Sequence, residues 1–509
     1  FGRLNYNLME RYLLTVTFRA DGSSKFAPSN RWGYFPAAAL GWRMSEEAFL
    51  NDVNWLDNLK LRVSYGEVGN DGINSSLWSQ NWESTSDKRY QGAVNGAFLP
   101  SYSLGADMAN KDLKWETTIT RNIGVDFGFF NSRLTGTIDA YWNTTKDLLM
   151  KTAIPGITGF TTTYANVGQT SNKGIEIALQ CVLVKTRDWN VTAGFNINFN
   201  RGKVDKLADN VTGLYGTEWA TSSTFPKSDY VLKEGRPVGL VRGLTADGFY
   251  TTDDFTYENG VYTLKKGVAD VSSAVFPNYH LHNGINERPA GQLAYPGMAK
   301  FKDLNDDGII NDDDVDVIGD MTPVHTGGFN INATYKNFDL GLYFNWSYGN
   351  EIYNVNKLAA LYGYKEGAVY ENKLSIVKDC YKIYDVVNGE LVALTTPEQL
   401  NAANANAKLP LAYSENGYVS TLGIEDGSYL RLNTLTLGYT LPKNILQKVG
   451  ISNLRVYGSI YNVFTITGYS GIDAEVSTST STKTYPQLGM DWGTYPRARS
   501  FVLGVNLSF

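Results

Sequence analysis

The chain has 509 residues, of which 13% are aromatic and 19% charged, with 50 glycines and a formal net charge of -6. No run approaches the roughly 18 consecutive apolar residues of a membrane-spanning helix, and no basic-aromatic stretch indicates a nucleic-acid partner. This composition is typical of a β-barrel wall that faces lipid on one side and water on the other.

Segments of about ten residues with strict alternation of apolar and polar side chains recur along the chain, as in strands that cross an outer membrane. In residues 191–200, the apolar set is Val191, Ala193, Phe195, Ile197 and Phe199, and the other positions are Thr, Gly and Asn. Residues 338–347 and 500–509 repeat this pattern. The chain ends on Phe509, which resembles the terminal strand signal of outer-membrane proteins.

Thirteen segments are predicted as strands. In chain order they are residues 1–7, 12–19, 31–43, 59–65, 115–130, 133–143, 173–184, 189–200, 326–336, 338–346, 429–441, 454–467 and 500–509. The links that we expect on the periplasmic side are short, whereas 202–325 and 349–427, expected outside the cell, are the longest. Residues 44–58 form a longer inner link, for which we expect a short helix with Ser45 as N-cap and Glu46 and Glu47 in its first turn.

An odd number of strands cannot close a barrel alone, because single-chain bacterial barrels have even strand numbers. We therefore predict an all-β fold: the C-terminal portion, about 13 strands, of a plugged transmembrane antiparallel β-barrel of about 22 strands with long extracellular loops. Residues 1–509 would all belong to this one domain, with the plug domain and the N-terminal strands upstream of Phe1. A soluble β-sandwich is the alternative, but its outward faces would be rich in Lys and Glu.

Several long blocks are similar to the SusC/RagA-like family of TonB-linked outer-membrane transporters. They are residues 12–50, 55–72 (with LKLRVSYGEVGNDG), 303–320, 335–354 and 427–446, and the resemblance extends over essentially the whole chain. It implies a multi-pass barrel in the bacterial outer membrane that imports oligosaccharides or peptides. It also implies two partners, a SusD-like surface lipoprotein that acts as a lid and a TonB complex that acts through the upstream part.

Residues 303–314, DLNDDGIINDDD, match the pattern of a calcium-binding loop. The expected ligands are Asp303, Asn305, Asp307, the carbonyl of Ile309, Asn311 and Asp314, while Gly308 permits the sharp turn. Asp in place of Glu at the last position resembles dockerin-type loops and favours weaker binding. We expect a structural Ca²⁺ in an extracellular loop, and the alternative is an acidic Asx-turn loop without a metal.

Aromatic side chains in the external loops are the candidate ligand contacts, because such rings stack on sugar rings or peptide side chains. They are Trp78, Trp82, Tyr90, Trp219, Tyr362 and Tyr364, with packing within the loops as the alternative for each. His280 and His282 could share one face, but two ligands do not make a metal site. No GxSxG, P-loop, GxGxxG or HExxH motif is present, so no catalytic residues and no enzyme are expected.

The leading hypothesis is a TonB-dependent importer subunit whose ligand path is lined by the external loops and a hydrated inner wall, with lipid around the barrel. The wall is expected to carry Asp126, Asp139, Asn143, Glu176, Gln180, Asn196, Asn198 and Asn345. One alternative is a passive porin, which would lack an N-terminal plug. The other is a surface receptor or adhesin that binds a ligand without transporting it.

Overall fold

The computed structural model describes residues 1–85, 92–99, 101–208, 211–220, 224–276, 288–361, 372–412, 417–446, 450–478 and 487–509. Its main element is a 13-stranded sheet in which every neighbouring pair is antiparallel. The strands are β1 (Gly2–Leu8), β2 (Tyr12–Gly22), β3 (Trp32–Arg43), β4 (Leu56–Asn70), β10 (Glu116–Phe129), β11 (Leu134–Lys146), β14 (Gln169–Lys185), β15 (Trp189–Lys206), β26 (His325–Tyr335), β27 (Phe338–Tyr348), β32 (Tyr429–Thr440), β33 (Asn453–Thr467) and β35 (Ser500–Ser508). Each predicted strand is present, so the prediction of an all-β fold with 13 antiparallel strands is confirmed.

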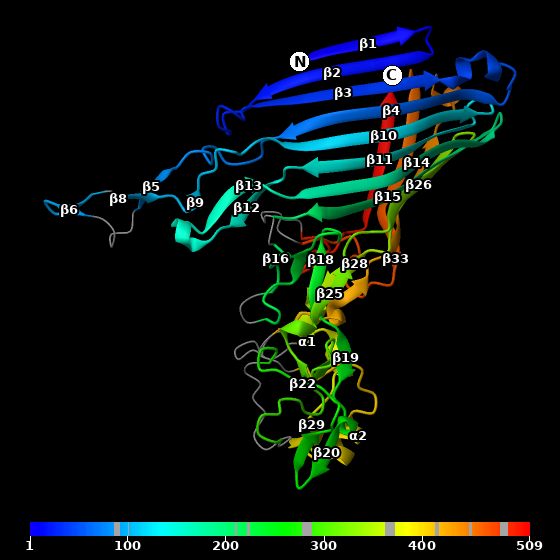
Figure 1. Ribbon diagram of the computed structural model, residues 1–509. Helices are drawn as coiled ribbons and strands as arrows, with labels where there is room; N and C mark the ends of the chain where they lie inside the picture. Colours follow the sequence, from blue (N-terminus) through cyan, green and yellow to red (C-terminus); the bar gives the residue numbers. More distant parts are fainter. Residues whose placement is uncertain are drawn as a thin grey trace.

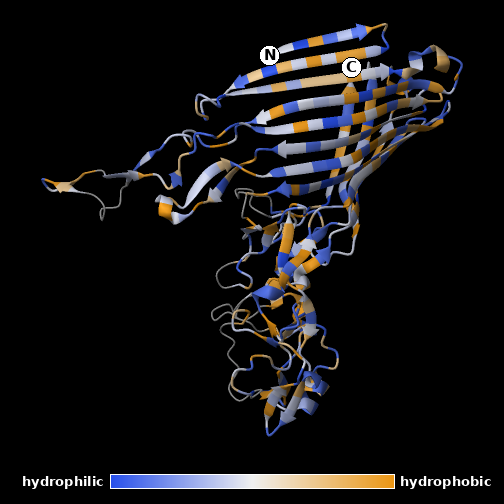
Figure 2. Ribbon diagram, in the orientation of Figure 1, coloured by the Kyte–Doolittle hydropathy of each residue, from blue (hydrophilic) through white to orange (hydrophobic). Residues whose placement is uncertain are grey.

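The sheet follows the order of these strands in the chain and is curved, with β1 at one edge and β35 at the other (Figure 1). Hydrophilic and hydrophobic residues alternate along its strands (Figure 2). The strand register places apolar residues opposite apolar ones and the polar set opposite the polar set. For example, Phe195 of β15 lies opposite Phe329 of β26, and Asn196 lies opposite Gly328. One face of the sheet is therefore apolar and the other polar, as in a barrel with lipid outside and water inside.

The links between strands alternate in length as expected. Residues 9–11, 186–188 and 336–337 form tight turns at one end of the sheet, whereas residues 207–324 and 349–428 connect strands at the other end. Several strands are longer at this second end than predicted, because backbone pairing continues where the apolar alternation stops. For example, Gln169 of β14 pairs with Lys206 of β15, beyond the predicted end of both strands.

The inner link between β3 and β4 differs from the prediction. It contains two 3-10 turns, Met44–Glu46 and Ala48–Leu50, and the residue that precedes the first turn is Arg43, not Ser45. Neither turn has a side-chain cap. Glu47 is extended between them, and its carboxylate accepts hydrogen bonds from the Tyr12 hydroxyl (2.6 Å) and the Trp42 indole (3.0 Å). These donors from the ends of β2 and β3 hold Glu47 outside a helix.

The two longest links pack together into one external body beyond the rim of the sheet (Figure 1). Its main apolar core joins Tyr250, Tyr262 and Phe301 of the first link to Leu400 and Tyr418 of the second. No helix in the described ranges is long and apolar enough to cross a membrane.

The remaining strands and helices are short and lie in the links. They are β5 (Trp82–Thr85), β6 (Ala93–Val94), β7 (Ala97–Phe98), β8 (Ser101–Leu104), β9 (Asp107–Met108), β12 (Leu149–Ala153), β13 (Thr162–Asn166), β16 (Leu214–Gly216), β17 (Tyr230–Leu232), β18 (Leu240–Leu244), β19 (Ala246–Phe249), β20 (Phe255–Glu258), β21 (Val261–Leu264), β22 (Asp270–Val271), β23 (Ala299–Phe301), β24 (Ile309–Ile310), β25 (Val315–Asp320), β28 (Glu351–Asn354), α1 (Val355–Leu361), β29 (Tyr384–Val387), β30 (Glu390–Ala393), α2 (Pro397–Ala403), β31 (Ile424–Asp426), α3 (Lys443–Leu446) and β34 (Met490–Asp491).

Candidate functional site

The polar face of the 13-stranded sheet is the inner wall of the barrel. The register brings Asp139 of β11 opposite Glu176 of β14, and Glu176 opposite Asn198 of β15. Strands alternate their side chains between the two faces, so this pairing fixes which residues share the wall. All the polar wall residues expected from the sequence fall on it: Asp126, Asp139, Asn143, Glu176, Gln180, Asn196, Asn198 and Asn345.

One ion-pair cluster crosses three strands of the inner wall. Arg62 of β4 reaches over β10, and its guanidinium nitrogen Nη2 lies 2.9 Å from Oδ2 of Asp139 on β11. Its Nε also donates to Asp126 of β10 at 2.9 Å. Gly124 lies on the intervening strand beneath this contact, and a Cβ there would be only 2.4 Å from Asp139 Oδ1. The missing side chain therefore makes room for the contact.

A second cluster repeats this arrangement elsewhere on the wall. Arg455 of β33 reaches over β32 to Asp339 of β27, with 2.9 Å between Nε and Oδ1. Gly438 lies between them on β32, and its Cβ would be 2.4 Å from Asp339 Oδ1. The Arg455 guanidinium also lies 4.7 Å from the ring centre of Tyr457. Neither cluster was predicted from the sequence. Which glycine lies between two charged residues of neighbouring strands can be known only from the strand register.

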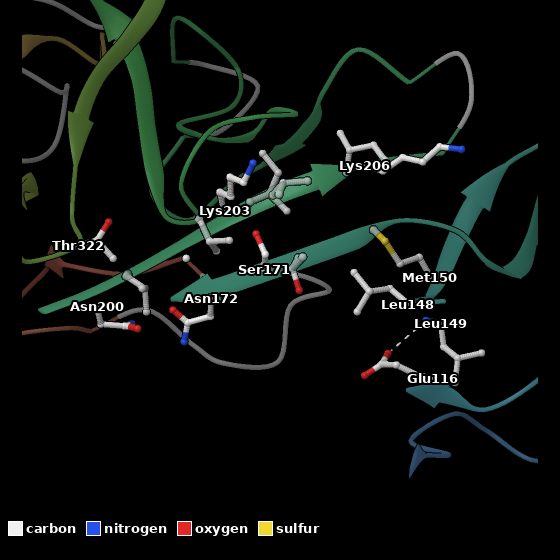
Figure 3. Close-up of a pocket in the computed structure, with 17 residues that line it drawn as sticks. Glu116, Leu148, Leu149, Met150, Ser171, Asn172, Asn200, Lys203, Lys206 and Thr322 are labelled. Atoms are coloured by element: carbon white, nitrogen blue, oxygen red, sulfur yellow. Dashed lines mark hydrogen bonds between the residues drawn. The ribbon is translucent and has the colours of Figure 1, made fainter. Parts of the chain in front are cut away.

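A pocket of about 490 Å³ opens where strands of the inner wall meet the external links (Figure 3). Leu148, Leu149 and Met150 provide apolar lining, while Lys203 and Glu116 are charged. The Glu116 carboxylate accepts a hydrogen bond from the backbone N–H of Leu149 at 3.3 Å. None of the predicted ligand contacts lines this pocket. The apolar run 148–150, which follows the polar end of a strand, was a feature of the sequence that could have indicated the pocket.

The predicted aromatic ligand contacts do not form one site among the described residues. Trp78 is half-buried, and Trp82 is 66% exposed on β5. Trp219 packs in the external body, with its ring centre 6.5 Å from that of Tyr353. β5 and the neighbourhood of β16 stand well apart at the rim (Figure 1). Tyr90, Tyr362 and Tyr364 lie outside the described residues.

The predicted calcium loop folds into a compact turn. Asp303 accepts backbone N–H groups of Asp307 (3.3 Å) and Gly308 (2.7 Å), and Asn305 also accepts from Asp307. Gly308 has a φ of +85°, which a turn of this kind requires. Asp314 is fully buried, and its two carboxylate oxygens accept N–H groups of Leu304 and Asn311.

Within the described ranges, no group of three or more His, Cys, Asp or Glu side chains is placed to hold a metal ion. The expected calcium ligands also include asparagine side chains and a backbone carbonyl. The calcium site therefore stays a prediction. His280 and His282 lie outside the described residues. His325 is on β26, and its Nδ1 accepts a hydrogen bond from the indole of Trp346 at 3.0 Å.

The external body holds several groups whose pKa is shifted. Burial raises the pKa of the Cys380 thiol to about 11, so it is neutral near pH 7. Burial alone would raise the pKa of Glu425 as well, but hydrogen bonds from Ser470 and the charge of Lys357 hold it below its ordinary value. Glu425 thereby joins β31, α1 and the link after β33 as a carboxylate.

Comparison with known proteins identifies the family. A family profile described as "TonB dependent receptor-like, beta-barrel" matches residues 1–285. TonB-dependent receptor P3 of Formosa agariphila is 31% identical over 514 residues, covering 100% of this chain and 45% of that protein. TonB-dependent receptor SusC of Bacteroides thetaiotaomicron is 31% identical over 517 residues, covering 100% and 43%. The chain thus spans about half the length of these relatives.

A solved structure has the same fold. The RagAB peptide importer in its "closed-closed" state superposes with a TM-score of 0.73 at 24% identity, covering 100% of this chain and 47% of the compared chain. Proteins of this family are transporters of the outer membrane, and the prediction that the chain is not an enzyme agrees with that. The chain belongs to the TonB-dependent receptor family, forms part of its outer-membrane β-barrel, and resembles the SusC/RagA type over its whole length.

Proposed function

We propose that the full-length protein imports oligosaccharides or oligopeptides across the outer membrane, driven by a TonB complex. The observation that carries this proposal is the inner wall, which is polar along its strands and ends at a rim with a pocket. The chain that forms this wall is similar to SusC over its whole length. A wall of this kind can guide a hydrated cargo, while the apolar face holds the barrel in lipid.

The partner that fits best is a SusD-like surface lipoprotein seated over the rim. Support comes from the fold shared with the RagAB peptide importer and from the external body beyond the sheet. Trp82 on β5 is an exposed aromatic at the same rim and is proposed as a ligand contact, together with Trp78. Trp219 is less suited, since it packs against Tyr353.

We further propose a structural role for Ca²⁺ in the loop 303–314. The oxygens of Asp303 and Asn305 already face the turn at Asp307 and Gly308, and the loop connects β23 to β25 in the external body. Binding would need Asp314 to exchange its two backbone partners for the ion. Such an exchange is consistent with the weak affinity expected for a short acid at this position.

Uptake by cells that produce the full-length protein tests the main proposal. Cells with an intact TonB complex should accumulate labelled oligosaccharide or peptide, and cells without TonB should not. A passive porin would carry the same cargo in both strains. A receptor or adhesin would bind the label at the cell surface without accumulating it inside.

A further inference from the structure

The lipid-facing side of the sheet carries a row of cationic side chains across β10, β11, β14 and β15, which lie side by side (Figure 1). Trp142 of β11 lies opposite Lys173 of β14, and Lys173 lies opposite Arg201 of β15. Arg121 of β10 flanks Trp142 on its other side in the same register. These four residues are called the basic row. Neighbouring strands lie roughly 4.8 Å apart, so the row spans about 14 Å.

The basic row lies directly beyond an apolar band. Two positions nearer the middle of each strand, the register pairs Ile123, Ala140, Ile175 and Phe199 across the same four strands. These residues share a face with the row, because side chains alternate along a strand. The row is on the side of the band toward the long external links, where outer-membrane barrels have an aromatic girdle. It therefore lies at the level of the outer-leaflet headgroups.

The three cations of the basic row have no ionic partner among the residues that the structure describes. Arg121 donates to Thr144 Oγ1 at 3.4 Å, and Arg201 donates to the carbonyl of Pro323 at 3.4 Å. Lys173 is exposed and makes no hydrogen bond within the same ranges. Charged side chains on the lipid face are tolerated near the headgroups, where they contact water or lipid phosphates.

Two carboxylates on this face lie farther toward the external links. Glu67 of β4 accepts a hydrogen bond from the Tyr65 hydroxyl. Asp205 of β15 pairs with Lys203 at 3.1 Å and accepts a hydrogen bond from Ser171 at 2.9 Å. Together with Lys203, the cations of the basic row exceed these two carboxylates by two positive charges, so the surface favours an anionic headgroup.

Phosphate groups suit the basic row better than other headgroup chemistry. A guanidinium binds two oxygens of one phosphate, and an ammonium group pairs with a phosphate as a point charge. The indole N–H of Trp142 donates no hydrogen bond within the described ranges and is a further donor at the same level. A zwitterionic headgroup would bring its own cation, and this cation would be repelled by the row.

We propose that the basic row binds an outer-leaflet lipid through phosphate groups on its headgroup, while the acyl chains of this lipid lie against the apolar band. The row lies in the interior of the sheet, between β4 and β26, and faces away from the inner wall. The inference therefore rests on the barrel alone and does not depend on the cargo that the protein carries.

The test compares variants of the full-length protein in a neutral detergent. The double variant Lys173→Gln/Arg201→Gln removes two charges of the basic row. Lys185→Gln is the matched control, because this exposed lysine lies at the opposite end of the same strand β14. Each protein is titrated with diphosphorylated lipid A, with the same lipid after removal of its phosphates, and with inorganic phosphate. Native mass spectrometry gives the Kd for each probe.

Wild type and Lys185→Gln should bind diphosphorylated lipid A equally, and more tightly than the dephosphorylated lipid. The double variant should bind the diphosphorylated lipid about 25-fold more weakly than wild type, which corresponds to about fivefold for each charge removed. Its affinity for the dephosphorylated lipid should be unchanged. Should the double variant lack the gel mobility of a folded barrel, Lys173→Gln alone replaces it, with an expected loss of about fivefold.

Three results would overturn the proposal. The first is undiminished binding of diphosphorylated lipid A by the variant, and the second is an equal loss in Lys185→Gln. The third is inorganic phosphate that binds as tightly as the lipid, since the site would then hold a free anion. None of these results bears on import, which the uptake experiment tests separately.

Discussion

Arg62 of β4 and Asp139 of β11 belong to strands that do not pair, yet their side chains meet at 2.9 Å above Gly124 of the strand between them. Arg455 and Asp339 meet in the same way above Gly438. Each contact ties three strands together on the inner wall. Because both pairs are partly shielded from solvent, with side chains 19–31% exposed, they are screened less than surface pairs.

The first prediction concerns Gly124. Replacement by Ala puts a Cβ into the space of the Arg62–Asp139 contact and should destabilise the folded barrel by about 1–3 kcal/mol, the usual cost of overpacking. This loss of stability is measured as a lower temperature at which the full-length protein changes from its folded to its unfolded gel mobility. Gly128→Ala on the same strand and face is the control, since its nearest neighbour lies at 3.4 Å. Equal behaviour of the two variants would contradict the role given to Gly124.

The second prediction concerns Glu425 and acid. Its folded-state pKa is lowered, so its contribution to stability is present above the unfolded-state pKa, about 4.3, and is lost as the pH falls below it. The unfolding temperature of the external body, followed by tryptophan fluorescence, should drop on acidification. The Glu425→Gln variant should have a lower unfolding temperature at neutral pH, and this temperature should drop less on acidification. An identical pH dependence in both proteins would show that Glu425 does not connect the links.

The third prediction concerns Cys380, which is 4% exposed. Its thiol should resist a water-soluble maleimide near pH 7, because the thiolate is the reactive form and burial raises the pKa to about 11. The neutral thiol stabilises the fold fully below its ordinary pKa of about 8.5, and this contribution falls as the pH rises toward 11. Leu391→Cys, at an exposed position on β30, is the labelling control. Rapid labelling of Cys380 in the folded protein would contradict its burial.

The fourth prediction concerns the loop 303–314. Isothermal titration of the full-length protein with Ca²⁺ should give heat above a Mg²⁺ control, with weak affinity. Asp303→Ala should abolish that heat, whereas Asp316→Ala, just outside the loop, should leave it unchanged. If calcium and magnesium give the same heat, the loop is an acidic turn that binds no calcium.

The sequence predicted the strands well because alternation is a local property that each strand shows by itself. Phe195 and Asn196 identify their faces without knowledge of any partner. The strand ends were predicted less well, since pairs such as Gln169 with Lys206 extend the ladder without an apolar face. In the link after β3 the expected helical structure is present as two 3-10 turns, but the N-cap at Ser45 was wrong. Glu47 is not helical, because distant donors, Tyr12 and Trp42, determine its position.

The functional features were harder to predict because they depend on contacts between distant segments. Tyr250 and Leu400 share one core although about 150 residues separate them in the chain, so neither link reveals the external body by its own pattern. The Arg62–Asp139 contact above Gly124 requires the register of three strands at once. Polar residues of the inner wall could be named from the sequence, but their pairing could not.

The central claim is that the apolar face of this sheet contacts lipid and the polar face contacts water. Spin labels at Phe195→Cys and Asn196→Cys test it most directly, in full-length protein whose native cysteines, Cys181 and Cys380 among them, are replaced by Ser and which is reconstituted in lipid vesicles. The label at 195 should be reached by oxygen dissolved in the bilayer, and the label at 196 by a water-soluble nickel chelate. The same accessibility at both positions, or the reverse order, would contradict a membrane-spanning barrel wall here.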